Sequence, residues 1–235
     1  MLPDLYWVYK KLFNAFGPQG WWPTTAPDEN KPVHRGKPPG LERERFEIII
    51  GAILTQNTSW RNVEKALQNL IKKKMIDVNK IAACEDTRLA ELIRPAGYYN
   101  QKARRLKDFA SFLLTEYDGK TTNLFSHDLE TLREKLLCLK GIGPETADSI
   151  ILYAAQKPIF VIDAYTIRIL RRLGFEVKGY EDAQKLFMSN LPNDVKVFKE
   201  YHALLVHLGK NYCKKQKPLC NSCPLTGICR FSKGS

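Results

Sequence analysis

The sequence predicts an all-α protein, because helical periodicity recurs along most of its 235 residues while strand signals are rare. Apolar residues spaced three and four apart predict amphipathic helices. No pair of alternating runs around a tight turn indicates a β-hairpin, and the one strand-like run covers residues 158–162. No fixed-period repeat is present. We therefore expect short helices joined by loops and packed around apolar cores.

The first half begins with an amphipathic helix over 5–16, followed by a long irregular connection over 17–40. This connection holds six of the 13 prolines and four of the 14 glycines. Connections this long are usually functional or disordered, and two adjacent tryptophans, Trp21 and Trp22, favour a function. Further helices are expected at 46–56, 60–73, 87–93 and 101–116. The first of these is apolar nearly all round, so it should be buried.

The second half continues with short, frequent helices. They are expected at 128–137, 145–156, 164–173, 181–191 and 195–211. Residues 97–100 are predicted to form a turn.

Composition and charge exclude several classes of protein. Hydrophobic residues make up 44% of the chain and charged residues 26%, which argues against global disorder and against a fibrous protein. No apolar stretch approaches the roughly 20 residues of a membrane span, and the N-terminus lacks the layout of a signal peptide. We therefore expect neither a membrane nor a secreted protein, and the localisation expected is cytoplasmic.

The chain is strongly basic. Its 37 Lys+Arg and 25 Asp+Glu give a net charge of +12, which predicts attraction to a polyanion, most often nucleic acid. Solvated lysines are the ordinary alternative explanation. The basic residues concentrate in 209–235, which has six and no acidic residue, and in a second cluster formed by Lys102, Arg104, Arg105 and Lys107.

Four of the six cysteines lie near the C-terminus with the spacing C-x6-C-x2-C-x5-C; they are Cys213, Cys220, Cys223 and Cys229. Clustered cysteines in a reducing compartment usually hold a metal rather than form disulfides. Four thiolates suit either a tetrahedral zinc ion or a [4Fe–4S] cluster, and the spacing alone leaves both open. The other two, Cys84 and Cys138, are predicted to be buried small hydrophobes.

A short glycine-containing turn is expected between two helices at Leu139-Lys-Gly-Ile-Gly-Pro144. Gly141 and Gly143 permit backbone angles that other residues resist, and Pro144 suits the first position of a helix. Such a turn exposes backbone N–H groups beside a helix N-terminus, which can bind one DNA phosphate without reading sequence. A tight helix–helix joint is the alternative. Asp163, after an apolar run, is predicted to cap the following helix.

Taken together, these motifs resemble the endonuclease III branch of the helix-hairpin-helix DNA glycosylases over about residues 42–230. The hairpin, Asp163 and the four-cysteine tail carry the resemblance, and segments 52–58 and 97–103 are also similar. The resemblance implies a [4Fe–4S] cluster in place of zinc, a catalytic Asp163, and a monomer that binds damaged double-stranded DNA between two helical lobes. One lobe would be 41–157, and the other 1–40 plus 158–235.

One departure from the family pattern concerns the reaction. Bifunctional members have a lysine two residues after the second hairpin glycine, and this lysine attacks the sugar. Here that position is Glu145, and a carboxylate cannot form a Schiff base. The sequence therefore predicts a monofunctional glycosylase. The nearby Lys140 precedes the hairpin glycines and is expected to meet phosphate.

Several segments are similar to the 3-methyladenine DNA glycosylase III subgroup, in which aromatic rings sandwich the alkylated base. This similarity implies a pocket of Trp21, Trp22 and Trp60 beside Glu145, with one of the adjacent tryptophans able to serve as an anchor instead. Gln56 resembles the plug that fills the gap left by the flipped base, and Tyr98 the intercalating wedge. Lys214 and Lys215, between the first two cysteines, would face phosphate.

Three alternative functions stay open. A glycosylase in this family could act on oxidised pyrimidines with another amine as nucleophile, or on deaminated or mismatched bases. A DNA-damage binding module without chemistry is the alternative from a different class, although the presence of Asp163 argues against it.

Overall fold

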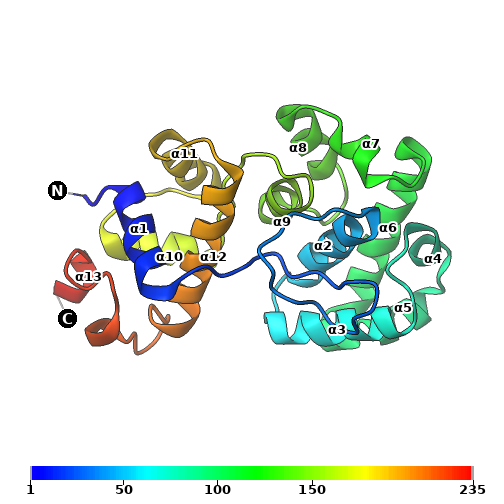
Figure 1. The fold of residues 1–235 in the computed structure, drawn as a ribbon, viewed down its shortest axis with the longest axis horizontal. Coiled ribbons are helices and arrows are strands. Elements are labelled where there is room, and N and C mark those ends of the chain that lie inside the picture. Colours follow the sequence, from blue (N-terminus) through cyan, green and yellow to red (C-terminus); the bar gives the residue numbers. More distant parts are fainter. Residues whose placement is uncertain (1, 234–235) are drawn as a thin grey trace. The chain divides into compact units, whose positions relative to one another are not determined.

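The computed structural model describes residues 2–233, and its regular structure there is helical, with one isolated antiparallel bridge between Thr24 and Val33 (Figure 1). This confirms the all-α prediction. The chain forms two compact units: one joins the N-terminal segment up to Trp21 with the chain from Pro158 onward, and the other is Trp22–Lys157. Residues 22–40, expected in the lobe with the C-terminal helices, thus belong to the other unit.

The Trp22–Lys157 unit is built around a buried helix, as predicted. Every residue from Phe46 to Leu54 is buried in this helix, α2, which contacts both early and late helices of the unit. The elements are α2 Glu42–Leu54, α3 Trp60–Lys72, α4 Val78–Ala83, α5 Asp86–Leu92, η1 Arg94–Ala96, α6 Tyr99–Tyr117, α7 Thr121–Phe125, α8 Leu129–Leu137, α9 Pro144–Ser149 and η2 Ile150–Ala154.

The sequence did not predict two helices of this unit, α4 and α7. They are only six and five residues long, which is too short to show a helical period. The N-terminus of α7 is capped by a side chain of α2. Glu42 accepts bonds from the backbone N–H of Thr121 at 2.8 Å and of Thr122 at 3.2 Å. A carboxylate distant in sequence therefore serves the N–H groups that a local cap would otherwise satisfy.

The other unit has an aromatic core where the segment 158–162 meets two of its helices. Its elements are α1 Leu5–Phe16, α10 Ala164–Leu173, α11 Tyr180–Asn190, α12 Val195–Asn211, η3 Cys220–Ser222 and α13 Arg230–Lys233. The Phe160 and Phe187 rings stack with centroids 4.0 Å apart, and Phe198 and Tyr201 contact Phe160 edge-on. Aromatic burial of this kind dominates the stability of such a core.

The strand-like run 158–162 is extended, but it pairs with no strand. Residues 159–162 are buried, and the side-chain amide of Gln184 donates to the Phe160 carbonyl at 2.7 Å. Periodicity cannot distinguish a buried strand from any other buried extended segment. Cys84 is buried as predicted, whereas the prediction for Cys138 is wrong: it follows α8 and is exposed. No helix in the described part of the chain has the length and apolarity to cross a membrane.

Candidate active site

Asp163 caps α10, as predicted, and its two carboxylate oxygens have different surroundings. Oδ1 accepts from the backbone N–H and from the hydroxyl of Thr166, both at 2.7 Å. These bonds fix the carboxylate on the first turn of α10. The other oxygen, Oδ2, takes part in neither capping bond, so it is the oxygen available for chemistry.

A histidine that the sequence analysis did not single out lies beside this oxygen. The Nε2 atom of His202 on α12 is 3.9 Å from Oδ2 of Asp163. Burial lowers the pKa of His202, and the nearby Asp163 carboxylate raises it. The lowered pKa favours the neutral imidazole at pH 7.

In the Trp22–Lys157 unit, the glycine turn joins α8 to α9, and a buried ion pair holds the two helices. Arg133 on α8 binds the fully buried Asp148 on α9 with contacts of 2.8 and 3.3 Å. Gly141 has a φ of 85°, which favours glycine, whereas Gly143 is extended and needs no special conformation. Lys140 is exposed at the turn, and Glu145 is exposed in the first turn of α9.

Gln56 is bonded to this hairpin. Its side-chain amide donates to the Gly141 carbonyl at 3.0 Å and to the Thr146 hydroxyl at 2.9 Å, and its amide oxygen accepts from Arg105. Gly141 also lets Arg105 approach, because a Cβ there would be 2.2 Å from the guanidinium Nε. The structure thus brings the predicted plug and the hairpin together.

Tyr98 stands out from the surface at the turn between η1 and α6. Its side chain is 66% exposed, although it is a large aromatic residue, and its backbone is left-handed with φ 48°. Left-handed backbone is costly for a residue with a side chain and is found preferentially at functional sites.

Of the three predicted pocket tryptophans, Trp22 is buried. It is 7% exposed, and its ring meets Trp60 and Tyr153 edge-on at centroid distances of 5.5 and 5.2 Å. It also packs against Gly51 of α2, where a Cβ would be 3.1 Å from the indole Nε1. Trp60, at the start of α3, and Trp21 are only partly buried.

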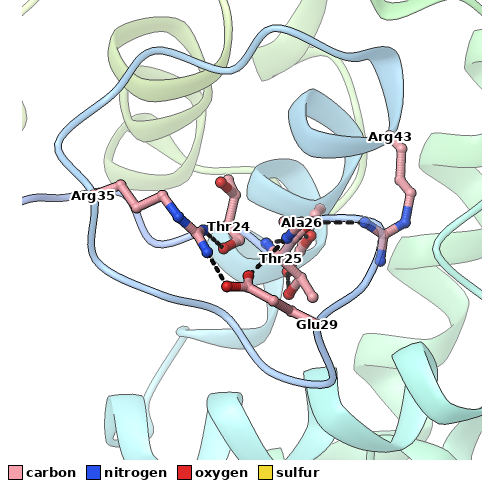
Figure 2. A network of polar contacts seen from close by, with 7 residues as sticks. Thr24, Thr25, Ala26, Glu29, Arg35 and Arg43 are labelled. Carbon is pink, nitrogen blue, oxygen red and sulfur yellow. Dashed lines mark hydrogen bonds and ion pairs between the residues drawn. The ribbon is translucent and has the colours of Figure 1, made fainter.

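A polar network fixes the irregular segment 24–35, which follows Trp21 and Trp22 in the chain (Figure 2). Arg35 donates to the Thr24 carbonyl at 2.9 Å and pairs with Glu29, which in turn accepts from the Ala26 N–H. Two residues of α2 attach the segment to the helix. Arg43 donates to the Thr25 carbonyl at 2.7 Å, and Glu47 accepts from the Thr25 hydroxyl at 2.6 Å and from its N–H at 3.2 Å.

Glu47 is a fully buried carboxyl group in this network. Burial raises its pKa to about 7, against the lowering effects of the Thr25 bonds and of Arg43. Within the buried stretch 46–54 of α2 it is the one charged residue, and it accepts two hydrogen bonds from Thr25.

The four C-terminal cysteines line one small pocket, together with Arg172 and apolar side chains. Arg172 donates to the Cys213 sulfur at 3.2 Å and to the Lys214 and Lys215 carbonyls at 2.8 and 3.2 Å. Within residues 2–233, no three His, Cys, Asp or Glu side chains are arranged to hold a single metal ion. Lys214 and Lys215 are exposed beside the four cysteines.

Most of the basic cluster of α6 is buried or bonded to neighbouring groups. Lys102 is 1% exposed, Arg105 binds Gln56, and Lys107 pairs with Asp86 at 2.5 Å. Only Arg104 of the four is fully on the surface. Three of these cations therefore make internal bonds, so the net charge of α6 overstates its exposed charge.

The sequence comparison identifies the family. The profile of the "HhH-GPD superfamily base excision DNA repair protein" matches residues 50–193. The chain belongs to the HhH-GPD superfamily. It is 43% identical over 229 residues to MJ1434 of Methanocaldococcus jannaschii, provisionally named a DNA repair glycosylase, covering 96% of this chain and 95% of that protein. It is 30% identical over 195 residues to endonuclease III of Thermotoga maritima, covering 81% and 84%.

Solved structures agree with this assignment to the HhH-GPD superfamily. The fold is similar to the 3-methyladenine DNA glycosylase MagIII of Helicobacter pylori bound to 1,N6-ethenoadenine, with a TM-score of 0.70 and 30% identity over 88% of this chain and 98% of that one. It is also similar to an endonuclease III in a non-covalent DNA complex, with a TM-score of 0.77 and 25% identity over 100% and 98%. The chain is thus a DNA glycosylase of the base excision repair family.

Proposed function

We propose that this HhH-GPD protein is a monofunctional DNA glycosylase that flips an alkylated purine, such as 3-methyladenine, out of double-stranded DNA and hydrolyses its N-glycosidic bond. The observation that carries the proposal is the side chain that follows the hairpin. Glu145 stands in the first turn of α9, where a bifunctional enzyme would need an amine. Hydrolysis must then depend on a carboxylate and water, and Asp163 supplies the carboxylate.

The reaction assigned to Asp163 balances without a covalent enzyme intermediate. The C1′–N bond breaks and its electron pair leaves with the base. A water oxygen bonds to C1′, and the proton of that water passes to the Oδ2 atom of Asp163 and then to solvent. The carboxylate also stabilises the positive charge that develops on the sugar. An N-alkylated purine is cationic and leaves as a neutral base, so no general acid is required.

The surroundings of Asp163 favour this role. The two bonds from Thr166 fix Oδ1. A neutral His202 next to Oδ2 brings no positive charge that would compete with the sugar cation for the carboxylate. Asp163 is therefore held in a fixed orientation, with Oδ2 outside both capping bonds.

For the base pocket, we assign stacking to Trp21 and Trp60 and an anchoring role to Trp22. The burial of Trp22 against Gly51, Trp60 and Tyr153 supports this division, because a ring packed on several sides cannot also stack on a base. Cation–π and stacking interactions favour a flat cationic base between aromatic rings. The complex of MagIII with 1,N6-ethenoadenine shows that a relative binds a flat modified adenine.

We assign duplex opening to Gln56 and Tyr98, and phosphate contact to the hairpin with Lys140, Gly141 and Gly143. The exposure of Tyr98 and the bonds between Gln56 and the hairpin support these roles. A flipped base costs a few kcal/mol of lost stacking and pairing, which inserted side chains offset in part.

The four cysteines are proposed to hold a [4Fe–4S] cluster. A cluster takes one thiolate at each of four separate iron atoms, whereas zinc draws four thiolates to one centre. The spacing C-x6-C-x2-C-x5-C, which resembles that of the endonuclease III branch, and the lining of one pocket by all four cysteines support the cluster. Its role here would be to fix the basic segment with Lys214 and Lys215, which then faces DNA phosphate.

A base-release assay on three duplexes tests the proposal. One duplex contains methylated purines, one contains thymine glycol, and one contains a G·T mismatch. We expect release from the methylated duplex only. Release from thymine glycol or from the mismatch instead would favour the oxidised-pyrimidine or the mismatch function, and no release from any duplex would favour a DNA-damage binding module.

A further inference from the structure

Lys102 is a buried cation that no role assigned above uses. It is 1% exposed on α6, and its Nζ atom donates to the Leu54 carbonyl at 2.9 Å and to the Ala96 carbonyl at 2.8 Å. Burial, together with the nearby Arg105, lowers its pKa to about 8. A buried charge without a carboxylate partner costs stability, so its placement calls for an explanation other than stability.

The two carbonyls that Lys102 binds are both at helix ends. Leu54 is the last residue of α2, and Ala96 is the last residue of η1. Carbonyls at a helix C-terminus lack partners within the helix, and a cation there is favoured by the helix dipole. One ammonium group therefore links the ends of two elements that are 42 residues apart in the chain.

Each linked end lies two residues before a residue assigned to duplex opening. Gln56 follows Leu54, and Tyr98 follows Ala96. Both turns contain left-handed backbone, with φ 53° at Asn57 and φ 48° at Tyr98. Strained turns persist only where the surrounding structure fixes them. The backbone N–H of Lys102 donates to the Tyr98 carbonyl at 3.0 Å, the first hydrogen bond of α6, which places Lys102 one helical turn after the Tyr98 turn.

We propose that Lys102 is a positioning residue for duplex opening, which holds the Gln56 segment and the Tyr98 turn at a fixed separation so that both side chains enter the DNA together. The inference rests on the proposed function of Gln56 and Tyr98. It concerns their coordination and does not depend on which base is removed. Loss of the ammonium group would leave each side chain present but wrongly placed relative to the other.

The test uses the full-length protein and a duplex that carries an abasic-site analogue with 2-aminopurine opposite it. Fluorescence of the 2-aminopurine reports the change in stacking when the side chains enter, and anisotropy reports binding. The variants are Lys102→Met and, as a matched control, Lys199→Met, which replaces another buried lysine whose pKa burial lowers, in the other unit. Circular dichroism confirms that each variant is folded.

We expect Lys102→Met to bind within about threefold of wild type, because phosphate contacts supply most of the affinity. Its fluorescence amplitude should fall by about fivefold or more, because small displacements of positioned groups are costly. Lys199→Met should keep the wild-type amplitude. An unchanged amplitude in Lys102→Met, or an equal loss in Lys199→Met, would overturn the inference.

A second variant covers the case in which Lys102→Met does not fold. Lys102→Arg keeps the charge, but a planar guanidinium does not reproduce the contacts of the compact ammonium, so we expect a reduced amplitude. A wild-type amplitude in this variant contradicts the proposal. Because the probe contains no alkylated base, failure of the alkylpurine assignment leaves this result intact. A wild-type protein that gives no signal overturns the inference without affecting the hydrolytic step.

Discussion

The Nε2 atom of His202 lies 3.9 Å from the Oδ2 atom of Asp163, and the two side chains come from different helices, α12 and the N-terminus of α10. Thr166 engages the other oxygen of the carboxylate. The imidazole is thus next to the oxygen that the proposed mechanism uses. The charge of His202 decides whether Asp163 acts as a free anion or as one half of an ion pair.

This relationship predicts an acid limb in the pH profile of base release. Burial lowers the pKa of His202 below its usual value near 6.5, and Asp163 raises it in part. As the pH falls through the pKa of His202, the imidazole becomes a cation next to Asp163. That cation then weakens the stabilisation of the sugar cation by the Asp163 carboxylate. Base release should decline there, and His202→Gln should abolish this limb. A histidine with a lowered folded pKa also makes stability rise with pH through the same window.

His207 on the same helix provides the control for this prediction. Burial lowers its pKa as well, but its ring packs on Phe16, with centroids 4.5 Å apart. His207→Gln should therefore keep the acid limb. Single-turnover release rates between pH 4.5 and 8 measure the effect, and an acid limb that survives in His202→Gln contradicts the role assigned to His202.

The three tryptophans should separate into two classes. Trp22→Ala removes a buried ring and should lower the free energy of unfolding by about 3–5 kcal/mol. Trp21→Ala and Trp60→Ala should instead reduce alkylpurine release by roughly 10-fold or more, the value of a stacked base, with smaller losses of stability. Urea unfolding and base release measured on all three variants test this division. A stable Trp22→Ala variant that releases no base would reverse the assignments of Trp21 and Trp22.

Glu47 should make stability depend on pH. Its folded pKa of about 7 lies above its usual value near 4.5, so the folded state binds more protons than the unfolded state between these values. Stability should therefore fall as the pH rises from about 4.5 to about 7, by roughly 3 kcal/mol at most. Urea midpoints at pH 5 to 8 measure the slope. Glu47→Gln should flatten it, whereas Glu29→Gln should not, because the pKa of Glu29 is lowered and lies outside this window.

The cysteine pocket leads to a prediction about colour and composition. The purified protein should be brown and contain iron and sulfide in equal amounts, and Cys220→Ser should lose the visible absorption. Its C-terminal segment should then be cleaved faster by protease, because a tail this short cannot bury a core of its own. Cys138→Ser, which changes an exposed cysteine outside the pocket, should keep the colour. A colourless protein that contains zinc would contradict the cluster.

Local signals in the sequence suffice for much of the fold. The helix at α1, the buried α2 and the cap at Asp163 follow from periodicity and capping chemistry, and the structure confirms all three. Short helices such as α7 depend on a partner distant in sequence, here Glu42, so no local pattern reveals them.

The polar groups of the site are harder to predict because their roles depend on tertiary contacts. Lys102 looks like one member of a basic run, although its spacing from Leu106 and Phe109 places it on the buried face of α6. That spacing was the available signal. His202 lies in an apolar stripe, where a core histidine is the ordinary interpretation, and only the fold brings it beside Asp163.

The most direct test of the central claim is a single-turnover assay on methylated duplex DNA that identifies the released base by chromatography and measures strand cleavage in parallel. We expect release of 3-methyladenine without strand cleavage and without borohydride trapping. Asp163→Asn should bind the duplex but release base at least about 100-fold more slowly, since asparagine still caps the helix. Strand cleavage with covalent trapping, or near-normal release by Asp163→Asn, would contradict the account.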